Sequence, residues 1–266
     1  MKTALTISGS DPCGGAGVQA DLKTFGVLGV YGMSALTAIL VQNTQEIRHI
    51  HKIDGDLVVQ QIDAVAGDIE SDACKSGVLV DASIVEAVAD CIKRHKLFPY
   101  VCDPAIAGRD GNRLLDEAGV RSLTKRLLPL AALVTPDLSE AAMLTGVDAR
   151  AIASNAAARD VCKRLVDAGA KAVVLKGLPA EQRMIDIYFD GREFLEFSGT
   201  MQPAQKSHGS GAAFSAAICA GLALKMSIVD ANDQAKSLVN MAIQYSDGQG
   251  RGIAPINVLA FAPKKK

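Results

Sequence analysis

Short apolar runs alternate along the chain with longer segments whose apolar residues repeat at helical spacing. The short runs predict strands, several of them buried on both faces of a parallel sheet, and lie at 4–8, 34–41, 75–80, 100–103, 132–135 and 172–176. The longer segments predict helices between them and lie at 18–28, 56–67, 82–95, 116–127, 139–144 and 155–168. This alternation is typical of an α/β fold with a central, mostly parallel sheet and helices on both faces.

The pattern changes after residue 176. Segments 184–189 and 192–197 flank an Asp-Gly pair and predict a hairpin, and two further helices follow at 212–225 and about 230–245. Segment 45–53 alternates isoleucine with histidine and predicts a small edge strand or lid, whose histidines face solvent or a partner subunit rather than a metal. Without a linker or an internal repeat, residues 1–266 are expected to form one domain.

Composition narrows the functional classes. Hydrophobic residues make up 49% and charged residues 21%, as in ordinary globular proteins. The formal net charge of -1, the 4% aromatic content and the absence of Trp argue against a nucleic-acid partner. No apolar run reaches the 18 residues or so that a membrane span needs. The N-terminal run is too short for a signal-peptide core. The six scattered cysteines lack metal-site spacing and predict reduced thiols in the cytoplasm.

The first candidate site is the Gly-rich segment that follows the first strand. It begins with Gly9, Ser10 and Asp11 and ends at Gly17, where a helix is predicted. Glycines there let a ligand approach the backbone, at the strand-to-helix switch where open α/β sheets bind ligands. The segment lacks the Lys-Ser/Thr ending of a Walker loop and matches the dinucleotide fingerprint poorly. A simple turn with Cys13 as a small loop residue is the alternative.

The second candidate is the start of the Ala-rich helix. Gly209, Ser210 and Gly211 lie directly before it. Free N–H groups and the positive end of the helix dipole make such a start an anion site, and glycines leave room for a phosphate. A Gly-rich cap without a ligand is the alternative. His208 is interpreted as a hydrogen-bond partner that shapes the loop rather than as a base.

The third candidate consists of polar residues at the ends of predicted strands. Asp137 and Glu140 follow one strand at a spacing that could hold Mg²⁺ through water. Helix capping by Asp137 explains the same pattern without a ligand. Asp103 and Lys176 end two other strands and have similar alternatives. Several such residues at one predicted sheet edge together favour ligand binding more strongly than any single residue does alone.

Taken in order, these segments resemble the hydroxymethylpyrimidine and phosphomethylpyrimidine kinases of thiamine biosynthesis, which have a ribokinase-like fold. The resemblance covers almost the whole chain and is most specific at its opening signature, residues 9–24. The other matching positions fall in the expected order at Gln42-Asn43-Thr44, Asp103-Pro104, Gly111, Arg113-Leu114-Leu115, Thr135-Pro136, Glu140, Lys176-Gly177 and His208-Gly209-Ser210-Gly211.

The resemblance implies transfer of the ATP γ-phosphate to the hydroxymethyl group of the pyrimidine and then to the monophosphate, in a cytoplasmic homodimer. It implies an anion hole for the transferred phosphoryl group at Gly209, Ser210, Gly211 and the following N–H groups. The other implied roles are Mg²⁺ organisation by Glu140 and Asp103, nucleotide binding by Lys176, Asp137 and Ser210, pyrimidine binding by Gln42, and pocket lining by Gly9 and Asp11.

Three positions depart from the family pattern. Ala212 stands where these pyrimidine kinases usually carry Cys and other ribokinase-like enzymes carry Asp as the base. Either another group activates the substrate hydroxyl, or activity is reduced, or the chain is an engineered or diverged copy. A pyrimidine-binding regulatory protein that lost the base is a separate alternative. Asp137 replaces an expected Asn and Leu178 an expected Gly. A pyridoxal-type vitamin kinase is a further alternative, because related enzymes phosphorylate both ring systems.

Overall fold

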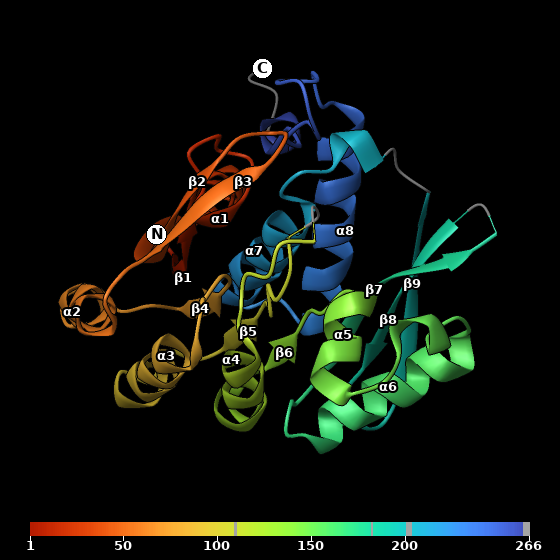
Figure 1. Cartoon of the computed structure of the whole chain (residues 1–266), viewed down its shortest axis with the longest axis horizontal. Helices are drawn as coiled ribbons and strands as arrows, with labels where there is room; N and C mark the ends of the chain where they lie inside the picture. Colours follow the sequence, from red (N-terminus) through yellow and green to blue (C-terminus); the bar gives the residue numbers. More distant parts are fainter. Residues whose placement is uncertain (109–110, 182, 201–203, 263–266) are drawn as a thin grey trace.

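One nine-stranded sheet runs through the computed structural model, which describes residues 1–108, 111–181, 183–200 and 204–262 (Figure 1). The order across the sheet is β3-β2-β1-β4-β5-β6-β7-β8-β9. The strands are β1 (Thr3–Ser10), β2 (Tyr31–Gln42), β3 (Ile47–Lys52), β4 (Ala73–Ser76), β5 (Tyr100–Cys102), β6 (Leu133–Val134), β7 (Val173–Ala180), β8 (Arg183–Phe189) and β9 (Phe194–Thr200).

Helices cover both faces of this sheet, which confirms the predicted α/β fold (Figure 1). They are α1 (Gly17–Val27), α2 (Gly55–Ala66), α3 (Ala82–Arg94), α4 (Glu117–Ser122), α5 (Leu138–Thr145), α6 (Asn155–Asp167), α7 (Ser210–Ala223) and α8 (Ile228–Gln244). The core of one face includes residues of α1, α7 and α8, and that of the other includes residues of α2 to α6. Successive β5 residues enter opposite cores, because side chains alternate along a strand. Among the described residues, no helix is both long and apolar enough to cross a membrane.

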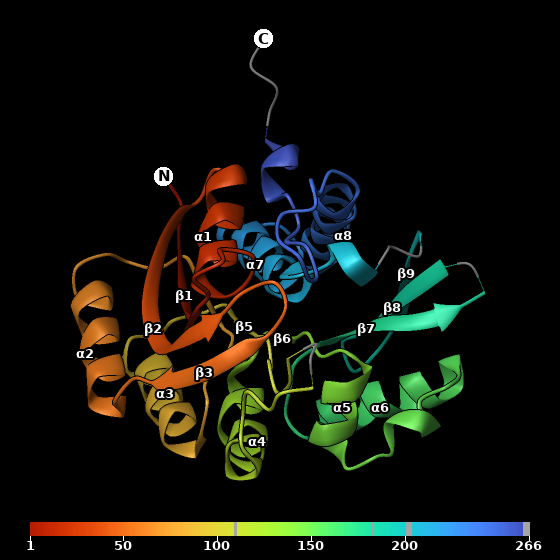
Figure 2. The same cartoon turned by 45° about the horizontal axis from the view of Figure 1, so that its top comes forward.

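The middle of the sheet is parallel and its two edges are antiparallel. Strands β2, β1, β4, β5, β6 and β7 pair in parallel. At one edge β3 pairs antiparallel with β2, and at the other β7, β8 and β9 form an antiparallel meander (Figure 2). The predicted edge strand and hairpin are therefore confirmed. Because parallel strands end at the same edge, the segments that follow β1, β4, β5, β6 and β7 meet there.

Several predicted boundaries were wrong. The strand predicted at 75–80 lies at Ala73–Ser76, because the chain leaves the sheet at Gly77 and Val80 has a positive φ of 65°. Conversely, β7 continues past its predicted end at 176 to Ala180, through a register shift between Leu175 and Leu178. Gly177 makes this continuation possible because its φ is +80°.

The helix predicted at 116–127 is not a regular α-helix throughout. The α-helical part is Glu117–Ser122, followed by a π-helical turn at Leu123–Leu127 and a 3₁₀ turn at Leu128–Leu130. Pro129 lies in the last turn and cannot donate a backbone hydrogen bond. The predicted helical segment is therefore confirmed in extent, but apolar spacing alone does not distinguish these helix types.

A buried ion pair connects β4 to α1. Lys75 Nζ lies 2.7 Å from Asp21 Oδ1, and the two side chains are 1% and 0% exposed. Thr6 donates a 2.6 Å hydrogen bond to the other carboxylate oxygen. Both charges are thus removed from water and depend on each other.

Replacing Lys75 by Met should reduce the free energy of unfolding by about 3–5 kcal/mol, because Asp21 would then be a buried, unpaired charge. Urea denaturation measures this loss. The double variant Asp21→Asn/Lys75→Met has no buried charge and should recover most of the stability. An equal loss in the single and double variants would show that the charge of Asp21 is not the cause.

Candidate active site

A cavity of about 500 Å³ opens at the edge of the sheet where the parallel strands end. Its lining contains every candidate residue proposed from the sequence, although these come from distant parts of the chain. They are Gly9, Asp11, Gln42, Asp103, Asp137, Glu140, Lys176, Gly209, Ser210, Gly211 and Ala212. The fold therefore brings the three candidate sites together around one space.

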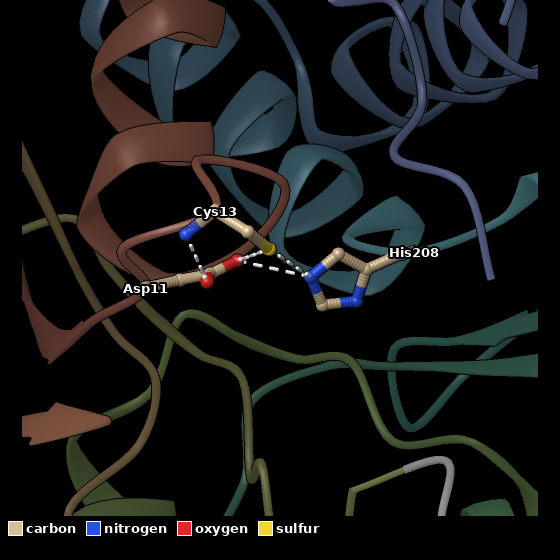
Figure 3. Close-up of side chains that lie close together, drawn as sticks. All are labelled: Asp11, Cys13 and His208. Carbon is tan, nitrogen blue, oxygen red and sulfur yellow. Dashed lines mark hydrogen bonds and ion pairs between the residues drawn. The ribbon is translucent and has the colours of Figure 1, made fainter. Parts of the chain in front are cut away.

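Asp11 organises the Gly-rich loop between β1 and α1. Its Oδ2 accepts hydrogen bonds from the N–H groups of Gly15 (3.1 Å) and Ala16 (2.7 Å). His208 Nε2 lies 2.9 Å from the same oxygen (Figure 3). Burial pushes the pKa of Asp11 up, but hydrogen bonds from His208, Cys13 and Gln42 outweigh it and hold the pKa well below its usual range. Asp11 is thus an ionised carboxylate in the cavity wall, and His208 has the loop-shaping contact expected for it.

The second Gly-rich segment packs directly on the first. Gly209 precedes α7 with a φ of +84°, and a Cβ built on it would lie 1.6 Å from the carbonyl oxygen of Gly15. The N-cap residue Gly209 has no side chain with which to cap α7, and the N–H of Ser210 donates to Ser207 O at 3.2 Å. The first N–H groups of a helix lack intrahelical partners. The helix start therefore presents donors and a positive dipole end to the cavity.

Lys176 brings a positive charge to the same helix start. Its Nζ lies 3.7 Å from Asp103 Oδ1, and a Cβ built on Gly211 would lie 3.6 Å from it. Burial would lower the pKa of Lys176, but the surrounding carboxylates, led by Asp103 and Glu140, raise it above its usual value. The ammonium is therefore protonated and next to the first turn of α7, where it can neutralise an anion.

Asp137 and Glu140 form a capping box at the start of α5. Asp137 Oδ1 accepts from the N–H of Glu140, and Glu140 Oε2 accepts from the N–H of Asp137, both at 2.9 Å. Glu140 Oε1 also accepts from the N–H of Ile106 at 3.2 Å. Burial, with nearby carboxylates, raises the pKa of Glu140 to about 7 despite the opposing charge of Lys176. The capping alternative is thus realised, and it holds Glu140 rigidly at the cavity.

The acidic residues of the cavity suit a Mg²⁺ ion that keeps most of its water ligands. Within the described ranges, the carboxylates of Asp103, Asp137 and Glu140 do not converge enough for one ion to touch all three. Mg²⁺ usually keeps several waters and binds through one or two carboxylates together with substrate phosphates. The donor set therefore fits an ion held largely through water.

Sequence reasoning missed another charged pair in the cavity wall. Asp186 Oδ1 accepts from the N–H of Gly177 at 2.9 Å, and Asp186 Oδ2 lies 2.6 Å from Lys236 Nζ. Asp186 stands between two isoleucines in the apolar run of β8, and a carboxylate at such a position could have indicated a functional residue. Lys236 lies in the middle of α8, where a lysine has no distinctive pattern.

Known proteins resemble the chain over nearly its whole length. A sequence profile of the family described as "Phosphomethylpyrimidine kinase" matches residues 11–257. A hydroxymethylpyrimidine/phosphomethylpyrimidine kinase of Bacillus subtilis is 38% identical over 260 residues, covering 97% of this chain and 95% of the relative. One of Rhizobium meliloti is 41% identical over 256 residues, covering 94% of each.

Solved structures with the same fold include vitamin kinases of two kinds. The pyridoxal kinase from Staphylococcus aureus in complex with AMP-PCP has a TM-score of 0.91 at 31% identity and covers 100% of this chain and 96% of its own. A last common ancestor of two groups of vitamin kinases, abbreviated HMPPK and PLK/HMPPK, has a TM-score of 0.74 at 40% identity, covering 90% and 98%. These structures share the α/β architecture described above.

Proposed function

The chain belongs to the phosphomethylpyrimidine kinase family, and we propose that it phosphorylates 4-amino-5-hydroxymethyl-2-methylpyrimidine with ATP and then phosphorylates the monophosphate to the diphosphate. Phosphoryl transfer depends mainly on positioning and charge neutralisation. The observation that carries the proposal is the Gly-rich start of α7 beside the Lys176 ammonium, in the cavity that also contains Gln42.

The transferred phosphoryl group is held at the start of α7. Gly209 provides the tight approach to the neighbouring loop, and the N–H groups of Gly211 and the following residues donate to the phosphoryl oxygens, next to the N–H of Ser210, which also contacts Ser207 O. Lys176 neutralises the developing charge from the other side and also contacts the nucleotide phosphates. Ala212 contributes its backbone N–H only, because its methyl group cannot accept a proton.

The pyrimidine occupies the part of the cavity near Gln42. The amide of Gln42 offers both a donor and an acceptor, which matches the ring nitrogen and the amino group at the pyrimidine edge. Gly9 leaves room for the Leu40 side chain, which also lines the cavity, since a Cβ there would lie 2.7 Å from Leu40 Cδ1. Asp11 fixes the adjoining loop by accepting hydrogen bonds from the backbone N–H groups of Gly15 and Ala16.

Glu140, Asp103 and Asp137 are the residues that would hold Mg²⁺, largely through water. The ion, when bound, neutralises phosphate charge. Glu140 supplies a carboxylate fixed by two backbone N–H groups, and Asp103 supplies one fixed by Ser215 Oγ at 2.9 Å. Asp137 caps α5 and adds negative charge at the rim.

Binding of Mg²⁺ and nucleotide should strengthen as the pH rises through 7. The pKa of Glu140 is raised to about 7 in the metal-free protein, so its carboxyl is largely neutral below that pH and negative above it. A neutral carboxyl does not attract a cation, and binding must release its proton. Calorimetry of Mg·ADP binding between pH 6 and 8 measures this. In Glu140→Gln the affinity for Mg·ADP should depend less on pH. An unchanged pH dependence would mean that another group is responsible for it.

The proposed reaction is tested with the purified protein, Mg·ATP and hydroxymethylpyrimidine, followed by the monophosphate, with both products followed by mass spectrometry. Formation of the diphosphate supports the proposal. Bound pyrimidine without turnover, not rescued by Ala212→Cys, would contradict it and support a regulatory pyrimidine-binding protein instead.

Pyridoxal phosphorylation is the second candidate function. It is favoured by the resemblance to a solved pyridoxal kinase at a TM-score of 0.91. A competition assay with equal concentrations of pyridoxal and hydroxymethylpyrimidine separates the two candidates. Higher kcat/KM for the pyrimidine supports the main proposal, and higher kcat/KM for pyridoxal would replace it.

We further propose that residues 1–266 act as one kinase domain that forms a homodimer in the cytoplasm. The single sheet from β3 to β9 supports one domain. The six free cysteines support a reducing compartment. Light scattering with size exclusion tests the dimer.

A further inference from the structure

Three side chains of different chemistry meet where the two Gly-rich loops pack together. Asp11 and Cys13 come from the loop after β1, and His208 comes from the segment before α7 (Figure 3). Cys13 Sγ lies 3.2 Å from Asp11 Oδ2 and 3.4 Å from His208 Nε2, and His208 Nε2 lies 2.9 Å from Asp11 Oδ2. All three potential ligand atoms therefore face one another.

The donor set is one that Zn²⁺ prefers. Thiolate, imidazole and carboxylate are its usual protein ligands, at about 2.0–2.3 Å. Each separation within the cluster is shorter than two such bonds, so one ion can contact all three atoms. Asp11 and His208 also line the cavity, which leaves room for a water as the fourth ligand of a tetrahedral site. Mg²⁺ prefers oxygen ligands and fits this cluster poorly.

The negative charge of Asp11 adds to the attraction of the cluster for a cation. Its side chain is 1% exposed. Among the described residues, the one ion pair of Asp11 is with His208, whose charge depends on its protonation. A buried carboxylate is costly unless a positive charge or several donors compensate it. In the metal-free protein the N–H groups of Cys13, Gly15 and Ala16 donate to this carboxylate, and Cys13 Sγ and His208 Nε2 lie within hydrogen-bonding distance of it.

We propose that Asp11, Cys13 and His208 form a site for a thiophilic divalent cation, with Zn²⁺ as the best match. The ion replaces two protons, the thiol proton of Cys13, which is released, and the proton on His208 Nε2, which leaves or moves to Nδ1. The site is separate from the Mg²⁺-binding carboxylates and does not depend on the identity of the kinase substrate.

Occupation of this site ties the two loops together. His208 directly precedes Gly209, and Asp11 holds the N–H groups of Gly15 and Ala16, so a shared ion fixes both loops at the start of α7. A bound ion would therefore stabilise the packing of the two loops at the anion site.

Titration of the metal-free protein with Co²⁺ tests the site directly, because Co²⁺ bound to a thiolate gives a charge-transfer absorption band. We expect one Co²⁺ per chain with this band, and its displacement by Zn²⁺. Cys13→Ser should abolish the band and weaken Zn²⁺ binding in calorimetry by at least about 100-fold, more than the loss of an outer-shell partner would. Circular dichroism verifies that the variant is folded.

Two control variants retain the site. His49→Ala/His51→Ala removes the exposed histidine pair of β3, whose rings lie 6.5 Å apart, and Cys91→Ser removes a thiol in α3. Both should bind Co²⁺ like the original protein. A charge-transfer band that survives in Cys13→Ser, or that disappears in either control, would overturn the proposal.

Discussion

Ala212→Asp should raise kcat by about 100-fold or more, because general-base catalysis contributes typically 10²–10⁴-fold and Ala212 has no group that can accept a proton. The residue lines the cavity in the first turn of α7, beside the N–H groups proposed to hold the phosphoryl group. A carboxylate at this position is favoured by the helix dipole. It would take the proton of the substrate hydroxyl as the phosphoryl group is transferred.

Ala212→Asn is the matched control, since its amide has nearly the same shape and cannot act as a base. Steady-state kinetics of both variants at saturating Mg·ATP separates base catalysis from improved packing. We expect a large rise in kcat for Asp and little change for Asn, with KM for the pyrimidine affected less than kcat. Equal kcat values in the two variants would mean that another group of the protein already activates the hydroxyl.

The sequence predicted the main features of the fold because local patterns determine them. The apolar runs of β1 and β5 are buried on both faces, as parallel strands between two helix layers require. The residues at strand ends then had to meet at one edge, and the cavity lies there. The predicted boundaries of β4 and β7 were wrong because the glycine near each strand end has a different effect. The chain leaves the sheet at Gly77, whereas β7 continues past Gly177 through a register shift.

Contacts between distant segments were beyond sequence reasoning. The approach of Cys13 to His208 joins residues 195 positions apart. The pairs of Lys75 with Asp21 and of Lys236 with Asp186 likewise join different elements. A lysine in a helix or strand predicts a solvated side chain, and only the packing of the sheet against α1 and α8 reveals that Lys75 is buried and Lys236 partly buried. The capping box of Asp137 and Glu140 could be predicted, because both residues belong to one helix start.

Gly209→Ala should lower kcat/KM by at least about 100-fold, comparable with the loss of an oxyanion-hole donor. Gly209 has a φ of +84°, and the new Cβ would lie 1.6 Å from the carbonyl oxygen of Gly15. Backbone atoms cannot rotate out of the way as a flexible side chain can. The two Gly-rich loops must therefore separate, which displaces the N–H groups at the start of α7 and the contact of His208 with Asp11.

Gly248→Ala separates this clash from backbone strain. Gly248 has a similar φ of +76°, but a Cβ built on it has no neighbour within 4 Å. It should cost the ordinary strain of a non-glycine residue at positive φ, on the order of 1 kcal/mol of stability, and leave kcat/KM unchanged. Kinetics together with thermal unfolding of both variants measures the two effects. If Gly209→Ala lost only as much activity as Gly248→Ala, close packing of the two loops would not be what builds the anion site.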